Sequence, residues 1–162
     1  MIEIKHGATG ELMFTCVADT LAGADMGCAN LFEAHMQHMD LSNANLCGAD
    51  MNEANLTGAT LVGANLCAVS FWGSILNEAD LRQADLSEAR LWYTQLKDAR
   101  LEGAEFTHAT VRDTDLAGAD LRNQRFVRAD LSSTNFRGAN LSGADLSESV
   151  LTRACLAGAD LS

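Results

Sequence analysis

The chain has 162 residues and a mass of 17.3 kDa, the size of a single domain, and its apolar runs are at most four residues long, whereas a membrane-spanning helix needs about 20. It carries 22 acidic and 11 basic residues, and this net charge of −11 argues against binding nucleic acid through phosphate contacts, which require cationic side chains. Charged residues interrupt the first 20 positions, so no secretory signal is predicted and we expect a cytoplasmic protein.

The N-terminal segment, residues 1–18, differs in pattern from the rest of the chain. Residues 2–6 and 11–15 alternate weakly between apolar and polar side chains, and they flank the sequence Gly7-Ala8-Thr9-Gly10. Two short alternating segments around a glycine-containing loop are typical of a β-hairpin. We therefore predict an N-terminal hairpin domain over residues 1–18, which caps the first coil of the structure formed by residues 19–162.

A five-residue repeat occupies residues 19–162. Every fifth residue from Leu21 to Leu161 is apolar, over 29 consecutive positions, and the commonest unit is Ala, then Asp or Asn, then Leu and two variable residues. Neither the 3.6-residue period of a helix nor the two-residue period of a strand keeps such positions on one face. The chain must turn once per unit, with Ala and Leu facing inward, because residues two apart in extended backbone point the same way.

The number of units per coil follows from the charges. Residues one coil apart stack at about 4.8 Å, where opposite charges attract and like charges repel. Charged residues 20 positions apart form seven opposite pairs and three like pairs, whereas like pairs dominate at separations of 15 and 25. This favours an all-β, four-sided parallel β-helix of about seven coils. The predicted charge ladders are Asp80-Arg100-Asp120, Arg82-Glu102-Arg122, Glu105-Arg125-Asp145 and Arg128-Glu148.

The interior of such a coil is predicted to consist of columns of leucine, with Phe106 stacked on Phe126. On one side, the small inward residue becomes a hydroxyl residue in four successive coils: Ser74, Thr94, Thr114 and Thr134. Buried hydroxyls need hydrogen-bond partners, which ladder neighbours or nearby carbonyl groups could supply. Gln124 and Met39 are too large for the inward position that Ala usually holds, so local distortion is expected at both.

The repeat closely resembles that of the pentapeptide-repeat family over residues 19–162. The resemblance implies a right-handed quadrilateral β-helix. It also implies DNA gyrase as one partner, because the best-known members bind gyrase as mimics of duplex DNA and confer fluoroquinolone resistance. Gyrase-protecting relatives typically carry loops that interrupt the coil, whereas the repeat is unbroken in this chain.

No catalytic site is predicted, because a filled rod offers no concave site where a nucleophile and a base converge. We expect a non-enzymatic scaffold or interaction protein. Trp72, Trp92 and Arg112 fall in one outward column, with Arg90 and Tyr93 beside them and Phe32 two coils earlier. Exposed Trp, Tyr and Arg are enriched in binding hot spots, and Arg over Trp adds cation–π attraction. The alternative is that the stacked aromatic residues only stabilise the ladder.

The competing interpretation is a DNA-mimicking inhibitor of gyrase that uses the acidic early coils. Its candidate residues are Asp25, Glu33, Asp40, Asp50 and Glu53, with Glu33 and Glu53 stacked as like charges. The alternative is that these acids only keep the rod soluble. No segment resembling the N-terminal hairpin caps the last coil, so we expect either a homodimer through that coil or a further C-terminal segment beyond residue 162.

Neither a metal nor a cofactor is predicted. His35 and His38 share one side of an early coil, but no further ligand completes a first coordination shell at an obvious spacing. Cys47 and Cys67 occupy one outward column, where their Cα atoms should approach to the roughly 4.4–6.8 Å that a disulfide allows. The five cysteines are odd in number and form no CxxC pair, which favours free thiols and makes the stacking of this pair coincidental.

Overall fold

The computed structural model describes residues 2–16 and 20–162. Strands β1 (Ile2–His6) and β2 (Leu12–Cys16) pair antiparallel, with an irregularity in the register between Ile4 and Lys5. The predicted hairpin is therefore confirmed, although β2 begins one residue later than expected. The loop is closed by the His6 N–H, which donates to the Glu11 carbonyl at 2.9 Å. The predicted domain boundary at residue 18 lies outside the described residues.

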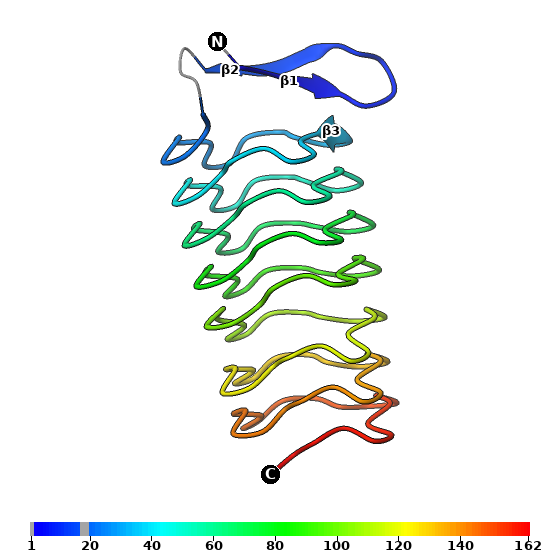
Figure 1. Cartoon of the computed structure of the whole chain (residues 1–162). Coiled ribbons are helices and arrows are strands. Elements are labelled where there is room, and N and C mark those ends of the chain that lie inside the picture. Colours follow the sequence, from blue (N-terminus) through cyan, green and yellow to red (C-terminus); the bar gives the residue numbers. More distant parts are fainter. Residues whose placement is uncertain (1, 17–19) are drawn as a thin grey trace.

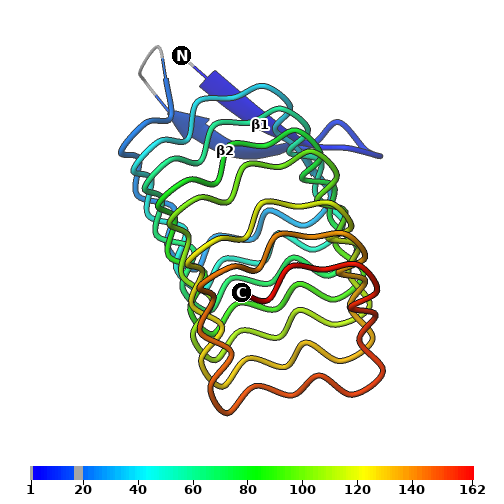
Figure 2. The ribbon, with the colours of Figure 1, turned by 60° about the horizontal axis from the view of Figure 1, so that its bottom comes forward.

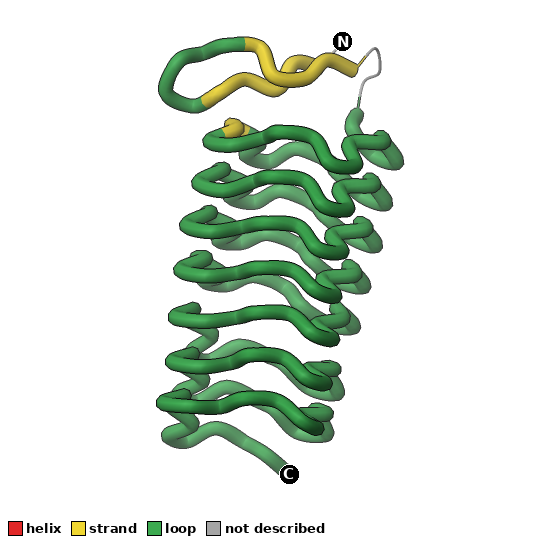
Figure 3. Tube along the Cα trace, turned by 180° about the vertical axis from the view of Figure 1, so that it is seen from behind, coloured by secondary structure: helices red, strands yellow, loops and turns green. Residues whose placement is uncertain are grey.

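The hairpin covers the first coil through a third strand, β3 (Ala34–His35), in the sheet order β2-β1-β3 (Figure 1). The pairing of β1 with β3 is antiparallel and joins Lys5 to His35. Gly7 follows β1 and donates its N–H to the Glu33 carbonyl at 2.6 Å. A Cβ atom on Gly7 would lie 2.8 Å from that carbonyl oxygen, so only glycine permits this close approach. In Figure 3, continuous strands are confined to the cap and β3.

The remaining chain winds into stacked coils. Parallel bridges join residues 20 apart, from Asp25 and Asn45 at one end to Asn140 and Asp160 at the other. Each lap therefore contains four pentapeptides, and the coils stack along one axis (Figure 2). The four-sided coil predicted from the charge pairs is confirmed.

Each pentapeptide turns the chain at the two residues after its central apolar residue. The Ala24 N–H donates to the Leu21 carbonyl at 2.9 Å, and Gly23 between them has a φ of 69°. A positive φ at this third position is what a type II turn requires. The residue before the leucine supports the turn, because Asp85 Oδ1 accepts the Ser87 N–H at 2.9 Å. This bond explains the preference for Asp or Asn before Leu.

The interior is filled by the inward-facing residues. Phe106 and Phe126 stack with ring centroids 5.0 Å apart, as predicted. The buried hydroxyls of Ser74, Thr94 and Thr114 donate to carbonyl groups 23 residues earlier at 2.7, 2.8 and 2.7 Å, and the Thr134 hydroxyl donates to the Val111 carbonyl. Of the two expected kinds of partner, backbone carbonyls are therefore the ones used.

The described residues contain no helical segment with the length and hydropathy of a membrane span.

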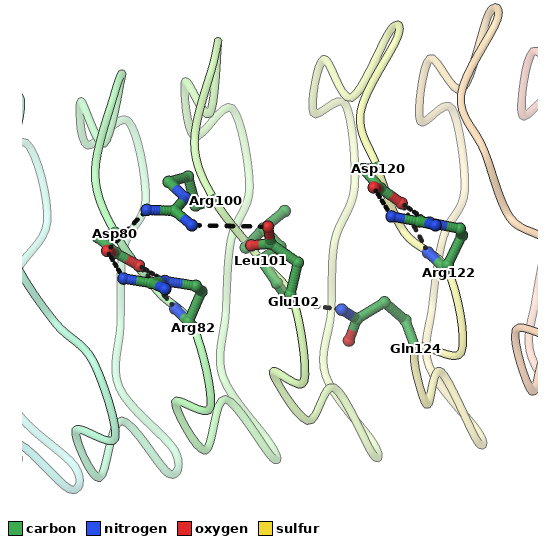
Figure 4. Close-up of polar contacts among 8 residues, drawn as sticks. All are labelled: Asp80, Arg82, Arg100, Leu101, Glu102, Asp120, Arg122 and Gln124. Carbon is green, nitrogen blue, oxygen red and sulfur yellow. Dashed lines mark hydrogen bonds and ion pairs between the residues drawn. The ribbon is translucent and has the colours of Figure 1, made fainter.

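The charge ladders form only in part. Arg100 lies 3.5 Å from Asp80, Arg125 lies 3.6 Å from Glu105, and Arg128 lies 2.8 Å from Glu148, as predicted. The predicted continuation from Arg100 to Asp120 is wrong, because Arg100 instead approaches Glu102 at 3.8 Å (Figure 4).

The Arg82-Glu102-Arg122 ladder is likewise wrong as a set of ion pairs. Arg82 and Arg122 each pair with the aspartate two residues earlier, Asp80 and Asp120, at 2.6 Å. Each aspartate precedes a turn and its arginine lies on the same turn, so the pair forms within one coil and does not depend on the stacking of neighbouring coils. Among the described residues, no ion pair joins Arg125 to Asp145 either. The sequence separation between charged residues therefore predicts the length of the lap correctly, but it predicts the individual ion-pair partners less well.

Candidate partner-binding surface

The aromatic and arginine residues predicted to form a surface lie on one side of the rod. Bridges join Ile75 to Gln95 and Gln95 to Asp115, which stacks residues 71–75, 91–95 and 111–115. The Gly73 N–H donates to the Trp92 carbonyl at 2.9 Å, and the Tyr93 N–H donates to the Arg112 carbonyl at 3.2 Å. We call the set Trp72, Arg90, Trp92, Tyr93 and Arg112 the aromatic–arginine surface.

The aromatic side chains of this surface are unusually exposed. Trp72, Trp92 and Tyr93 are 45%, 41% and 57% exposed. Among the described residues, the other exposed large hydrophobic side chains are Leu12 in the cap and Val150 and Leu161 in the last two coils. Exposed aromatic area in the middle of the rod is therefore confined to one side. A concentrated apolar patch of this kind is typical of an interaction surface.

Arg112 packs against Trp92. Its guanidinium carbon lies 5.5 Å from the centroid of the Trp92 ring, within the range of a cation–π contact. Its Nε lies 3.8 Å from Asp130 and is hidden from solvent without a hydrogen-bond partner. Within the described coils, the ring pairs involve other residues, and none joins Trp72 to Trp92.

Three polar residues beside this surface were not singled out from the sequence. The side-chain oxygen of Asn52 accepts the Trp72 N–H at 2.8 Å and the Ser70 hydroxyl at 2.7 Å, which fixes the backbone beneath Trp72. Asn52 lies exactly one lap before Trp72, so the lap itself could have identified it. A cavity of about 330 Å³ adjoins Tyr93, and Lys97 and Asp113 are among its lining residues.

The five acidic residues of the competing interpretation do not share one face. Asp25, Asp40 and Asp50 belong to three different bridge ladders, on three sides of the rod. Asp50 lies in the same ladder as Arg90, and Glu33 and Glu53 stand three residues after members of that ladder, in the column that later holds Tyr93. The early coils therefore carry negative charge on three sides of the rod, and part of it lies on the same side as the aromatic–arginine surface.

Most of these acids also have local structural roles. Asp25 accepts a hydrogen bond from Asn45 at 2.8 Å, and Asp50 accepts the Asn52 N–H at 3.1 Å. Hydrogen bonds from Ser42 hold the pKa of Asp40 below its usual value. Glu33 lies 3.8 Å from His6 of the cap.

The cysteines and early histidines form no evident chemical site. Cys47 and Cys67 are half-buried free thiols, and burial, followed by the neighbouring Cys47, raises the pKa of the Cys67 thiol. A raised pKa lowers the thiolate fraction and therefore the reactivity. His35 and His38 are exposed. Over residues 2–16 and 20–162, no three His, Cys, Asp or Glu side chains gather as a metal site would require.

Stacked parallel rungs around a filled interior define a β-helical solenoid. A family model described as "Pentapeptide repeats" matches the chain in eight copies over residues 29–66, 68–103, 84–123, 104–143 and 125–162. The chain belongs to this family, and its fold is the right-handed quadrilateral β-helix. No match was found among the curated proteins.

Several solved structures are similar to this chain. The pentapeptide-repeat protein Rfr23 from the cyanobacterium Cyanothece has a TM-score of 0.56 at 21% identity, covering 79% of this chain and 88% of its own. A trypsin-treated variant of QnrB1, a plasmid-mediated fluoroquinolone resistance protein, has a TM-score of 0.50 at 22% identity, covering 75% and 64%. HetL from the cyanobacterium Nostoc, involved in the regulation of heterocyst differentiation, has a TM-score of 0.49 at 28% identity, covering 85% and 70%. At these identities, Rfr23 and QnrB1 share the fold with this chain.

Proposed function

We propose that this pentapeptide-repeat protein is a non-enzymatic scaffold that binds a protein partner through the aromatic–arginine surface. The observation that carries the proposal is the confinement of exposed aromatic area in the middle of the rod to one side, with Arg112 packed on Trp92. Trp, Tyr and Arg dominate binding hot spots because they bury large areas and also donate hydrogen bonds. The partner surface should therefore offer an apolar patch with carbonyl or carboxylate acceptors for Arg90 and Arg112.

The filled interior supports a binding role rather than catalysis. The central residues are almost all fully buried and apolar, and the inward hydroxyls are engaged by backbone carbonyls. A hydroxyl that donates to a carbonyl in a dry interior has no adjacent base and no access to a substrate. Function then depends on the outward residues, which the fold holds in fixed columns.

The test compares two variants that differ only in which side of the rod they change. Trp92→Ala removes the centre of the surface, and Arg137→Ala changes an exposed residue on a different side. Proteins retained by the immobilised wild-type chain from a lysate of the source organism are identified, and affinities are then measured with the purified partner. We expect Trp92→Ala to weaken binding at least about tenfold, as loss of a hot spot does, and Arg137→Ala to leave it unchanged.

Thermal unfolding of both variants distinguishes binding from packing. If Trp92→Ala lowers the melting temperature substantially but leaves binding intact, the aromatic residues serve only to stabilise the rod, and the proposal is wrong. Tyr93→Gly is a second probe of binding. Tyr93 has a φ of 56°, which glycine adopts without strain, so this variant should fold at least as well while binding more weakly.

A second candidate function is inhibition of DNA gyrase by mimicry of duplex DNA. It is favoured by the charge of residues 1–80, which carry ten acidic side chains and one basic side chain. Supercoiling by purified gyrase should then fall in the presence of the protein. The effect should weaken with added salt and in the double variant Asp50→Asn, Glu53→Gln, because both reduce electrostatic attraction. An effect that depends on Trp92 instead supports the first proposal.

Self-association through the last coil is a further prediction. Val150 and Leu161 are 47% and 55% exposed, which gives this region apolar area for a second copy. Light scattering at tens of micromolar should report a dimer, and Leu161→Glu should convert it to a monomer. A monomeric wild-type protein at this concentration contradicts the prediction.

A further inference from the structure

Neighbouring coils are joined by a regular set of backbone hydrogen bonds. The amides of Leu76 and Glu78 donate to the carbonyls of Gln95 and Lys97 at 2.8 and 2.9 Å. On the next side, the amides of Leu81 and Gln83 donate to the carbonyls of residues 100 and 102 at 2.8 and 3.0 Å. The pattern joins each of these amides to a carbonyl one position short of a full lap ahead, and it recurs along the rod.

One lap later the pattern fails on two adjacent sides. In each pentapeptide, the central residue, the residue before it and the second residue after it normally donate their amides to a neighbouring coil. Residues 94–125 are all described. Within this stretch, seven amides at the three donor positions have neither a backbone nor a side-chain acceptor: those of Leu96, Asp98, Leu101, Gly103, Asp115, Asp120 and Arg125. The bridge ladder skips the same place, because Arg100 pairs with Asp80 and Asp120 pairs with Asn140, but Arg100 and Asp120 do not pair with each other.

We call the boundary between residues 96–105 and 116–125 the seam. It is closed on both flanks, where the Leu91 amide donates to the Thr110 carbonyl at 2.7 Å and the Phe106 amide donates to the Arg125 carbonyl at 3.0 Å. Figure 1 shows the wider spacing between the yellow-green coil and the yellow coil below it. A cavity of about 260 Å³ opens here, lined by residues 96–99 and 115–120.

Gln124 lies at the seam. It is 1% exposed and holds an inward position, where its Nε2 donates to the Leu101 carbonyl 23 residues earlier (Figure 4). Thr94 and Thr114 make the equivalent bond with a hydroxyl attached directly to Cβ. The carboxamide of Gln124 is longer by two heavy atoms, so the same acceptor is reached only if the coils stand further apart. The Gln124 Oε1 is buried and has no hydrogen-bond partner.

Side-chain contacts do not replace the lost backbone bonds. Arg100 forms ion pairs with Asp80 and Glu102, on its own side of the seam, while Asp120 pairs with Arg122 on the other. Within this fully described stretch, two side-chain contacts cross the seam, namely the bond from Gln124 to the Leu101 carbonyl and, beside the closed flank, the ion pair between Arg125 and Glu105 at 3.6 Å. Each block of coils is therefore well bonded internally and weakly bonded to the other along half of its perimeter.

We propose that the seam is a hinge that divides the rod into two blocks and that Gln124 sets its position. Opening occurs along the two unbonded sides about the closed flanks. Residues 91–93 and 110–112 form one of these flanks, so the contact between Trp92 and Arg112 spans the hinge. The proposal stands whether or not the aromatic–arginine surface binds a partner, because it concerns backbone protection alone.

Hydrogen exchange on the full-length chain tests the hinge. Amides that open locally exchange faster than amides that open only on global unfolding. In the wild-type protein, the amides of Leu96, Asp98, Leu101 and Gly103 should exchange at least about tenfold faster than their counterparts one lap earlier, Leu76, Glu78, Leu81 and Gln83. Equal protection of the two sets would overturn the proposal.

Two variants test the role assigned to Gln124. Gln124→Ala gives the inward residue found at the equivalent position of other laps, and Gln124→Thr gives the shorter donor used at Thr94 and Thr114. Both should slow exchange at the four seam amides to the rate of their counterparts. If these amides stay fast in both variants, Gln124 does not set the hinge. The second variant covers the case in which one substitution perturbs folding.

Discussion

Two neighbouring coil interfaces share the same repeat but differ in bonding. Between residues 76–83 and 95–102, backbone amides and carbonyls pair along both sides. Between residues 96–103 and 115–122, no such bonds form in this fully described stretch, although leucine stacks on leucine in both places. The central leucines therefore fix the lap, whereas the size of the small inward residue decides whether the coils close.

The largest expected effect comes from placing a glutamine at an inward position of a closed coil interface, which should open that interface. Ala84 is fully buried and holds the inward position two laps before Gln124. The Leu61 carbonyl is its equivalent acceptor, because it lies 23 residues before Ala84, as the Leu101 carbonyl lies 23 residues before Gln124. Ala84→Gln should open a second seam and reduce the free energy of unfolding by about 3 kcal/mol, combining overpacking with lost backbone bonds. Urea denaturation measures this loss. Ala84→Thr is the control and should cost about 1 kcal/mol or less, because its hydroxyl fits the normal spacing.

The complementary change should close the existing seam. Gln124→Ala removes a buried oxygen without a partner and allows the amides of the seam to pair. We expect the free energy of unfolding to rise by about 1–3 kcal/mol, since each recovered hydrogen bond contributes about 1 kcal/mol and part of this is offset by lost packing. Large-to-small substitutions in a core normally destabilise, so the sign of the change in urea denaturation is the decisive result. A loss of about 2 kcal/mol or more would mean that the side chain packs well where it is.

The hydroxyl ladder provides a smaller effect at a closed interface. Thr94→Val keeps the shape of the side chain but removes the 2.8 Å hydrogen bond to the Phe71 carbonyl. The expected cost is about 1 kcal/mol in the free energy of unfolding. Thr107→Val on the outside of the rod should change stability by less than about 0.5 kcal/mol. Similar costs at both positions would contradict a structural role for the buried bond.

The smallest expected effect concerns the two aspartates on either side of the seam. The hydrogen bond from the neighbouring arginine, Arg82 or Arg122, lowers the pKa of Asp80 and of Asp120. A carboxyl whose pKa is lower in the folded state stabilises the protein above its unfolded pKa, about 4, and this contribution is lost as the pH falls through the folded pKa.

Asp80→Asn should therefore cost at most about 1 kcal/mol at pH 7, because exposed ion pairs contribute little, and less at pH 2, where protonation of the carboxyl removes part or all of the charge. Asp120→Asn should cost less, since among the described residues Asp120 pairs with Arg122 alone, whereas Asp80 also reaches Arg100 in the next coil. Asparagine keeps an oxygen for the turn, which isolates the effect of charge. Urea denaturation at both pH values measures the difference, and an equal loss at pH 2 would show that charge is not the cause.

The sequence predicts the backbone well because the fold has a single period. The four-sided lap, the hairpin, the stacked Phe106 and Phe126 and the expected distortion at Gln124 all follow from which residues recur and where the recurrence fails. Distortion was also expected at Met39, but the following coil is regular there, with the Thr60 N–H 2.9 Å from the Met39 carbonyl. The position one lap before Met39 lies outside the described residues.

The sequence predicts individual contacts less well because the outward side chains have alternatives. An arginine on a turn reaches the aspartate two residues earlier as easily as an acid one coil away, so Arg82 pairs with Asp80 rather than with Glu102. The extent of the seam could not be predicted either, because it depends on how far the backbone yields to one long side chain. The column that contains Trp72, Trp92 and Arg112 was predictable, because it follows from the length of the lap alone.

The antiparallel cap has a consequence for polymerisation. A bare first coil would present parallel-pairing backbone to the last coil of another molecule, and rods could then elongate end to end into fibres. Instead, β1 crosses that rim in the opposite chain direction, with Lys5 and His6 set against β3. Because β1 pairs with β3 on one edge and with β2 on the other, the backbone groups of the rim at β3 are used within the chain and are closed to a neighbouring molecule.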